Sequence, residues 1–191
     1  MSVIQRIRKV VRYNRIATSF ALSVIFILFA KPTPGSFLIG VPVIFIGEVF
    51  RTLSSGYIEK DFSLTMGGPY SVTRNPLYLG NFLMGFGFAI ITNQPILLLL
   101  FIIVFAFIYH VTILEEEKGL LQRYGQEFIA YMSAVPRFFP MLWKWNRNRQ
   151  LFSWALVMKH REYITWLGIV GGILLLVAKM VLFGQGWKNY L

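Results

Sequence analysis

The 191-residue sequence contains no cysteine, only two histidines and only eight acidic residues. Without cysteine, disulfide bonds, thiolate metal sites and a cysteine nucleophile are excluded. The two histidines belong to no spaced set of metal ligands, so we expect no catalytic metal. Charged residues make up 14% of the chain and hydrophobic residues 56%, so lipid rather than water should surround most of the surface.

The sequence is instead dominated by long runs of apolar residues. They predict an all-α polytopic membrane helix bundle with about five transmembrane helices in a single membrane domain, residues 1–191. Short polar turns at 31–36 and 93–94 join the first and second and the third and fourth spans into hairpins. Glycines in the third and fifth spans are expected to allow close helix contacts. The predicted spans are 16–30, 37–53, 77–92, 95–114 and 163–183.

The net charge of +11 follows membrane topology rather than the pattern of a nucleic-acid-binding surface. Five basic residues precede the first span and eight lie between Lys118 and Arg161, whereas the opposite loops hold little beyond Lys31 and Lys188. We therefore expect a cytoplasmic N-terminus and a C-terminus on the other side. The basic start resembles a signal peptide, but no clean cleavage site follows, which favours an uncleaved first helix.

Seven of the eight acidic residues lie in two segments on the predicted cytoplasmic side, 54–76 and 115–162, so a polar site is expected there. In the second segment, residues 141–162 alternate aromatic and basic side chains. This composition predicts an interfacial helix that lies along the lipid headgroups. The alternating residues are Trp143, Trp145, Phe152 and Trp154 with Lys144, Arg147, Arg149 and Lys159.

A glycine turn at 67–68 leads into an Asn-Pro pair at the start of the third span. Asn75 suits the N-cap position and Pro76 the first helical position, which places backbone N–H groups beside Arg74. Such a helix start can bind an anion. Capping alone would also account for the Asn-Pro pair, and helix packing alone for Gly80 one turn further on.

Three adjacent carboxylates, Glu115, Glu116 and Glu117, follow the fourth span. If the helix continues, Glu116 shares a face with Tyr109 and Glu117 with His110, so at least one acid should point towards the bundle. Because the third and fourth spans form a hairpin, Arg74 and these acids are expected to lie close together. A solvated helix end is the alternative interpretation.

These two stretches resemble the membrane methyltransferase superfamily of isoprenylcysteine carboxyl methyltransferase and the phospholipid N-methyltransferases. The resemblance covers about residues 46–140. Its first motif, Gly-Pro-Tyr and then Arg-His-Pro-x-Tyr-x-Gly, corresponds to residues 68–70 and 74–80, with Asn75 in place of histidine. Its second motif begins at Glu116 and Glu117 and continues through Leu120, Tyr124, Gly125, Phe128, Tyr131 and the Val-Pro pair at 135–136.

The resemblance implies an enzyme that transfers a methyl group from S-adenosylmethionine, releasing S-adenosylhomocysteine, to a lipophilic acceptor. It also implies a cofactor pocket that faces the cytoplasm, without metal. The Asn75 side chain could form a hydrogen bond or cap the helix, but unlike histidine it could not accept and release a proton. The expected catalytic residues are Arg74, Glu116 and Glu117. The residues expected to bind the cofactor are Tyr70, Arg74, Asn75, Pro76, Tyr78, Leu79, Gly80, His110, Glu116 and Glu117. Those expected to bind the substrate are Glu48, Arg51, Tyr131 and Arg137.

Several alternatives remain open from the sequence. Glu48 and Arg51 could contact a substrate headgroup or form a local ion pair on the second span. The acceptor could be a prenylated carboxylate or a phosphatidylethanolamine amine. An NADPH-dependent sterol-type reductase shares a similar Arg-x-Pro-x-Tyr-x-Gly stretch, although Asn81 stands where we would expect an acid in that family. A non-catalytic membrane scaffold is the last alternative, and the oligomeric state cannot be predicted.

Overall fold

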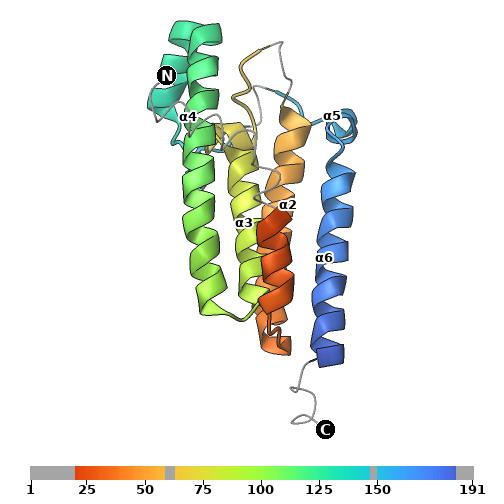
Figure 1. The fold of residues 1–191 in the computed structure, drawn as a ribbon. Coiled ribbons are helices and arrows are strands. Elements are labelled where there is room, and N and C mark those ends of the chain that lie inside the picture. The colour runs from red at the N-terminus through yellow and green to blue at the C-terminus, as the bar shows by residue number, and fades with distance from the viewer. Residues whose placement is uncertain (1–19, 59–62, 147–149, 184–191) are drawn as a thin grey trace.

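The computed structural model describes residues 20–58, 63–146 and 150–183. Within these ranges the regular elements are helices, with one isolated bridge between Gly68 and Asn146, so the predicted all-α class is confirmed (Figure 1). The helices are Phe20–Phe29, α2 (Pro34–Tyr57), η1 (Pro69–Ser71), α3 (Pro76–Ile91), α4 (Pro95–Ala134), η2 (Leu142–Lys144), α5 (Trp154–Lys159) and α6 (Glu162–Phe183).

Three of the helices, α2, α4 and α6, are long and apolar enough to cross a membrane, and Phe20–Phe29 and α3 are shorter apolar helices. Successive long segments alternate in direction, as the hairpin prediction requires (Figure 1). The two turns meet at one end of the bundle, where the backbone N–H of Lys31 donates to the carbonyl of Thr92 over 2.8 Å. The five predicted spans therefore correspond to five helical segments of an integral membrane protein.

A capping box fixes the start of α2. The Thr33 hydroxyl accepts from the backbone N–H of Ser36, the Ser36 hydroxyl accepts from that of Thr33, and Pro34 occupies the first turn. The same Ser36 hydroxyl donates to the carbonyl of Ile91 in α3 over 3.1 Å. The start of α2 is therefore held against the end of α3.

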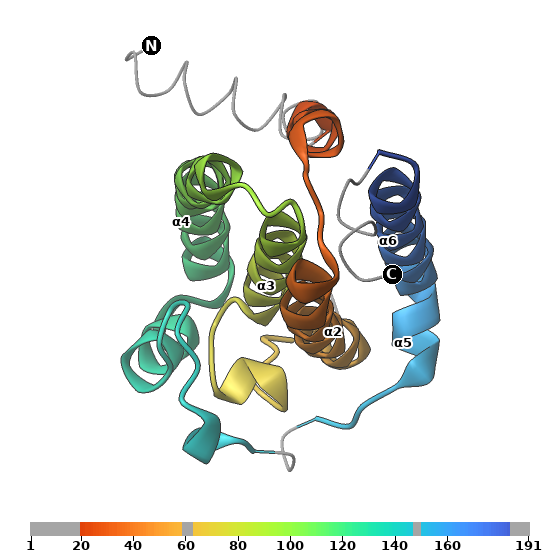
Figure 2. The same cartoon turned by 90° about the horizontal axis from the view of Figure 1, so that it is seen from below.

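α2 and α3 pack closely because glycines face each other along their contact. A Cβ atom at Gly87 would lie 2.6 Å from the carbonyl oxygen of Gly40, and one at Gly80 would lie 2.8 Å from that of Gly47. The predicted close approach is thus confirmed for the third span. In α6 it is wrong for Gly168 and Gly171, which meet nothing within 4 Å because they line a cavity, whereas a Cβ atom at Gly172 would lie 3.1 Å from the Phe88 ring of α3. α6 lies at the edge of the bundle (Figure 2).

α4 extends well beyond its predicted end at residue 114 and reaches Ala134. The stretch after the membrane span is rich in Glu, Lys, Leu, Gln and Arg, which are good helix formers, so the charges do not end the helix. Gly125, with φ 50° and ψ −120°, breaks the regular geometry and separates a final helical piece. In that piece Phe128 and Tyr131 pack against Leu64 and Val135.

The predicted helix along residues 141–162 is not formed as a single element. The described part contains η2, an irregular stretch and the six-residue helix α5. This segment is held to α2 instead: the N–H of Ser153 donates to the carbonyl of Gly56 over 2.9 Å, and the Phe152 ring packs on Tyr57 with centroids 5.9 Å apart. Trp143 and Trp154 are exposed.

α6 is attached to the rest of the bundle through both apolar and polar groups. Leu176 of α6 is buried in an apolar cluster with Ile44 and Met84. The indole N–H of Trp166 donates to the Thr52 hydroxyl over 3.1 Å. At the other end of the helix, the Lys179 ammonium donates to the carbonyls of Ile27 and Leu28 over 2.6 and 2.7 Å. Half of the residues of α6 are exposed on the surface.

Candidate active site

Glu117 lies between two arginine side chains at the end of the bundle opposite the Lys31 turn. Its carboxylate is 3.3 Å from Nη2 of Arg74 and 2.9 Å from Nη2 of Arg137, and Nε of Arg137 donates to both oxygens. The side chains of Glu117 and Arg74 are 8% and 10% exposed, whereas that of Arg137 is 45% exposed. The expected proximity of Arg74 and Glu117 is thus confirmed, and the cluster carries a net charge of +1.

Backbone contacts position this cluster by joining the loop before α3 to the segment after α4. The N–H of Arg74 donates to the carbonyl of Pro136 over 2.9 Å, and the Thr73 hydroxyl donates to that of Phe138 over 3.0 Å. Asn75 occupies the N-cap position as predicted, but its side chain makes no capping bond. Its amide donates instead to the carbonyl of Arg137 over 2.9 Å, because that segment lies within reach.

A second acidic side chain, Glu116, is exposed beside the charged cluster. The Tyr78 hydroxyl donates to Oε2 of Glu116 over 2.8 Å. The ring of Tyr78 also packs edge-on against that of Tyr109, with centroids 5.2 Å apart. Tyr78 and Glu116 therefore join the start of α3 to the part of α4 that carries Glu117.

Two polar atoms buried in this region have no partner among the described residues: Nε of Arg74 and the hydroxyl of Tyr70. Burial raises the pKa of the Tyr70 phenol well above its usual value, and Tyr131, Glu116 and Tyr78 raise it further. The phenol therefore stays neutral at physiological pH and can donate a hydrogen bond. Buried polar groups are normally paired, so these two atoms are available for hydrogen bonds with a polar ligand.

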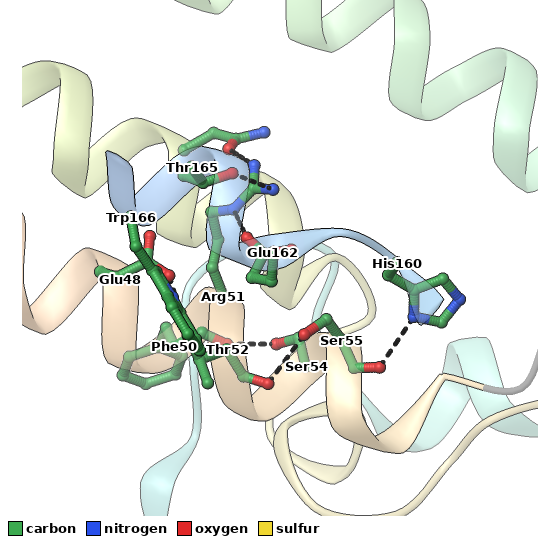
Figure 3. A network of polar contacts seen from close by, with 11 residues as sticks. Glu48, Phe50, Arg51, Thr52, Ser54, Ser55, His160, Glu162, Thr165 and Trp166 are labelled. Atoms are coloured by element: carbon green, nitrogen blue, oxygen red, sulfur yellow. Dashed lines mark hydrogen bonds and ion pairs between the residues drawn. The ribbon is translucent and has the colours of Figure 1, made fainter. Parts of the chain in front are cut away.

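A separate polar cluster is centred on Arg51 of α2 (Figure 3). Its guanidinium donates from Nε to Glu162, from Nη1 to Oδ1 of Asn81, and from Nη2 to the Thr165 hydroxyl over 3.3 Å. The ion pair considered between Glu48 and Arg51 is not formed. Glu48 accepts instead from Thr52 over 2.8 Å, because Glu162 in the first turn of α6 occupies the arginine.

An apolar cavity of about 800 Å³ lies between helix Phe20–Phe29, α3, α4 and α6. Aromatic residues such as Phe88, Phe101 and Phe105 form much of its wall. Its lining also includes Asn81 and Thr165, which bind Arg51, and Tyr109, which packs on Tyr78. The cavity therefore extends from the membrane-embedded part of the bundle to the Arg51 cluster, and on its other side to Tyr109, whose ring contacts Tyr78.

The sequence profile of the phospholipid methyltransferase family matches residues 18–127, more than half of the chain. The chain belongs to this family. The matched range includes Arg74, Tyr78, Glu116 and Glu117 and ends before Arg137.

Individual relatives of this family member match over part of their length. The nickel-cobalt-cadmium resistance protein NccN of Alcaligenes xylosoxydans is 35% identical over 107 residues, 55% of this chain and 48% of the relative. The cobalt-zinc-cadmium resistance protein CzcN of Cupriavidus metallidurans is 32% identical over the same shares. Protein-S-isoprenylcysteine O-methyltransferase of Saccharomyces cerevisiae is 33% identical over 89 residues, which are 47% of this chain and 37% of the relative. The chain spans about half the length or less of the curated relatives it matches.

In this phospholipid methyltransferase family member, the structure brings some of the predicted site residues together and places others elsewhere. Leu79 is buried, and Gly80 faces Gly47 and Arg51 of α2, so its missing side chain serves helix packing. His110 is exposed on α4 and has no hydrogen bond or ion pair among the described residues. The Tyr131 hydroxyl donates to the carbonyl of Tyr70 over 2.6 Å. The residues brought together are Tyr70, Arg74, Asn75, Tyr78, Glu116, Glu117 and Arg137, with Pro76 buried at the start of α3.

Three residues of the Arg51 cluster were not predicted from the sequence: Asn81, Glu162 and Thr165. One signal was available for Asn81, since it is a polar residue in an apolar span and lies three positions after Tyr78, on the same helix face. Glu162 opens the last apolar run and gave no local sign of its partner. Thr165 is too common in membrane helices to be singled out.

Proposed function

We propose that this chain is an S-adenosylmethionine-dependent integral membrane methyltransferase, similar to protein-S-isoprenylcysteine carboxyl O-methyltransferase, that methylates a lipophilic acceptor. The observation that carries the proposal is the contact of Arg74 with Glu117 beside the Tyr78–Glu116 pair, where the apolar cavity approaches. This arrangement places groups of both charges next to a space that suits a hydrocarbon tail. Family membership supports the same reaction class.

The polar groups of the site suit the charged parts of S-adenosylmethionine. When bound, that molecule supplies a methyl group already activated on a sulfonium centre. Arg74, whose Nε lacks a partner among the described residues, and the half-exposed Arg137 would hold its carboxylate. Glu116, which is exposed and accepts from Tyr78, would hold its amino group or ribose hydroxyls. Glu117 keeps the two arginines in place.

Positioning and exclusion of water are the contributions we assign to the protein, because an activated methyl group needs no covalent intermediate. The wall of the 800 Å³ cavity would hold a prenyl or acyl tail, and Tyr109 links that wall to Tyr78. We place the site at the cytoplasmic interface with the N-terminus inside. The basic residues gather before the first span and in the segment from Lys118 to Arg161, and basic loops stay on the cytoplasmic side of a membrane.

Two other enzymatic functions are weaker candidates. An N-methyltransferase of phosphatidylethanolamine would share the family and the methyl donor, and differs only in the acceptor. An NADPH-dependent reductase is disfavoured because Asn81, which accepts a hydrogen bond from Arg51, stands where we would expect an acid in that family. Two relatives are named for metal resistance, but the described residues hold no group of three metal-ligating side chains, so no metal site enters the proposal.

The test is isothermal titration of the purified protein in detergent with S-adenosylhomocysteine and, separately, with NADPH. We expect binding of the first and none of the second. Glu116→Gln and Tyr78→Phe should each weaken binding about tenfold, the effect of one hydrogen bond to a charged group. Glu115→Gln is the matched control and should bind as the wild type. Binding of NADPH alone would support the reductase, and binding of neither would support a scaffold.

Transfer of radiolabelled methyl from S-adenosylmethionine into a total lipid extract tests the activity itself. Label in the lipid phase that depends on Arg74 is the expected result. No transfer into lipid by a protein that binds S-adenosylhomocysteine would contradict a lipophilic acceptor.

A further inference from the structure

The polar end of the apolar cavity is organised by one guanidinium group. Among the residues that line the cavity, Asn81 of α3 and Thr165 of α6 come from different helices, and both bind Arg51. Figure 3 shows Thr165 and Glu162 on either side of the Arg51 guanidinium. Glu162 is 3% exposed and belongs to no cavity lining described above, so it holds the arginine from the buried side.

The chemistry of arginine fixes which atoms Asn81 and Thr165 present to the cavity. Arginine has only donors, so Asn81 must direct its amide oxygen to Nη1 of Arg51. The Asn81 amide nitrogen, with two N–H donors, then has no partner among the described residues. Thr165 accepts through its oxygen, which leaves its hydroxyl proton for another acceptor. Both cavity residues therefore offer hydrogen-bond donors.

Asn81 is also close to the place where we put the methyl donor. It follows Tyr78 by three residues on α3, which is about one helical turn and the same face. Tyr78 bonds to Glu116, and Tyr109 lies in both the cavity wall and the Tyr78 ring contact. A group held by Asn81 would thus lie between the hydrocarbon tail and the charged cluster.

We propose, on the basis of the proposed function, that Asn81 and Thr165 determine acceptor specificity and hold a carboxylate for methylation. Arg51 and Glu162 are positioning residues that act through them. Two donors match the two oxygens of a carboxylate, which accepts hydrogen bonds but donates none. An ammonium or amine group would meet further donors here instead of acceptors, and its N–H groups would lose their hydrogen bonds to water.

The reaction at this position balances without a base. One carboxylate oxygen forms the bond to the methyl carbon as the bond from that carbon to sulfur breaks, and the sulfur keeps the electron pair. The sulfonium becomes a neutral thioether, the carboxylate becomes a methyl ester, and no proton is released. An amine acceptor would have to give up a proton, for which neither Asn81 nor Thr165 can serve.

The test compares two acceptors with the same tail, N-acetyl-S-farnesylcysteine and S-farnesylcysteamine, together with a total lipid extract, using radiolabelled S-adenosylmethionine and the full-length protein in detergent. We expect base-labile label, which marks an ester, and little label on the amine. Base-stable label would instead mark an N-methylated amine, including one on a phospholipid whose phosphate occupied the donors.

The decisive variant is Asn81→Asp, which keeps an oxygen for Arg51 and replaces the N–H donors with an acceptor. Ester formation should fall about 100-fold, and about tenfold in Thr165→Val, in line with hydrogen bonds to a charged group. Affinity for S-adenosylhomocysteine should stay within about twofold in both variants, which shows that the fold and donor site are intact. Ser133→Ala, an exposed hydroxyl remote from the cavity, is the control and should match the wild type.

The outcomes separate this inference from the proposed function. If the wild-type protein methylates an acceptor but forms no base-labile product, or if Asn81→Asp forms ester at the wild-type rate, the inference is overturned and the methyltransferase proposal stands. If the wild-type protein does not bind S-adenosylhomocysteine, the proposed function itself fails.

Discussion

Arg74 and Glu117 form an ion pair across the α3–α4 hairpin, with 3.3 Å between Nη2 and Oε1, although they come from the two ends of that hairpin in the sequence. Both side chains are nearly buried. The pair therefore connects the loop before α3 to the helix that continues past the membrane span. Arg137 extends the connection to the segment after α4.

Glu117→Gln should destabilise the protein and weaken cofactor binding together. The change leaves Arg74 without its charge partner in a buried position, and we expect a loss of about 3 kcal/mol, the low end for removing one partner of a buried ion pair, because water reaches Arg137. Thermal unfolding in detergent measures it. Glu115→Gln should unfold like the wild type, and equal melting of the two variants would contradict the structural role of the pair.

Tyr70→Phe should have opposite effects on stability and on binding. The Tyr70 hydroxyl is buried without a partner among the described residues, so its removal should raise the stability of the ligand-free protein by about 1 kcal/mol. If the hydroxyl donates to the bound cofactor, the affinity for S-adenosylhomocysteine should fall about tenfold. Unfolding curves with and without S-adenosylhomocysteine measure both. A variant that loses stability without ligand would show that the hydroxyl is paired in the protein itself.

Gly87→Ala should separate α2 from α3. The added Cβ would lie 2.6 Å from the carbonyl oxygen of Gly40, and a backbone atom cannot move aside as a flexible side chain does. We expect a loss of about 2 kcal/mol or more, as for overpacking of a core. The matched control is Gly168→Ala, which meets nothing within 4 Å and should be neutral or stabilising by up to about 1 kcal/mol. The melting temperatures of the two variants test this prediction, and equal values would contradict the close contact of α2 with α3.

The natural absence of cysteine makes the membrane orientation directly measurable. We predict that Ser133→Cys reacts with a membrane-impermeant maleimide only from the cytoplasmic side, and Gly35→Cys only from the other side. Both positions are exposed, and they lie at opposite ends of the bundle. Labelling of intact cells and of inverted vesicles gives the answer. Reaction of both variants from one side would refute the assigned orientation.

The sequence alone predicted the contacts that follow from a single hairpin. Arg74 and Glu117 had to emerge at the same end because a short turn, residues 92–94, joins α3 to α4, and the motif around them indicated the register. The contact of Arg51 with Glu162 could not be found this way. It depends on where α6 docks along α2, and the chain between them passes through α3, α4 and residues 141–162.

Local patterns were least reliable where a distant residue competes with a near one. Glu48 and Arg51 are spaced for an ion pair on α2, yet Glu162 takes the arginine and Thr52 bonds to Glu48. The predicted N-cap position of Asn75 is confirmed, but the predicted capping bond is not formed. Its side-chain amide donates to the carbonyl of Arg137 instead, because that carbonyl lies within reach. Gly168 and Gly171 suggested helix packing, but a small residue favours contact only when a partner helix is there.

The position of α6 has a practical consequence for work on the purified protein. This helix is flanked by the 800 Å³ cavity on one face and, towards α2, by an apolar space of about 510 Å³ that includes Phe45 and Trp166. In a bilayer, acyl chains would occupy such spaces, and detergent molecules would replace them on extraction. Assays in lipid nanodiscs of defined thickness are therefore the appropriate reference state, and differences from detergent should appear first in the residues of α6.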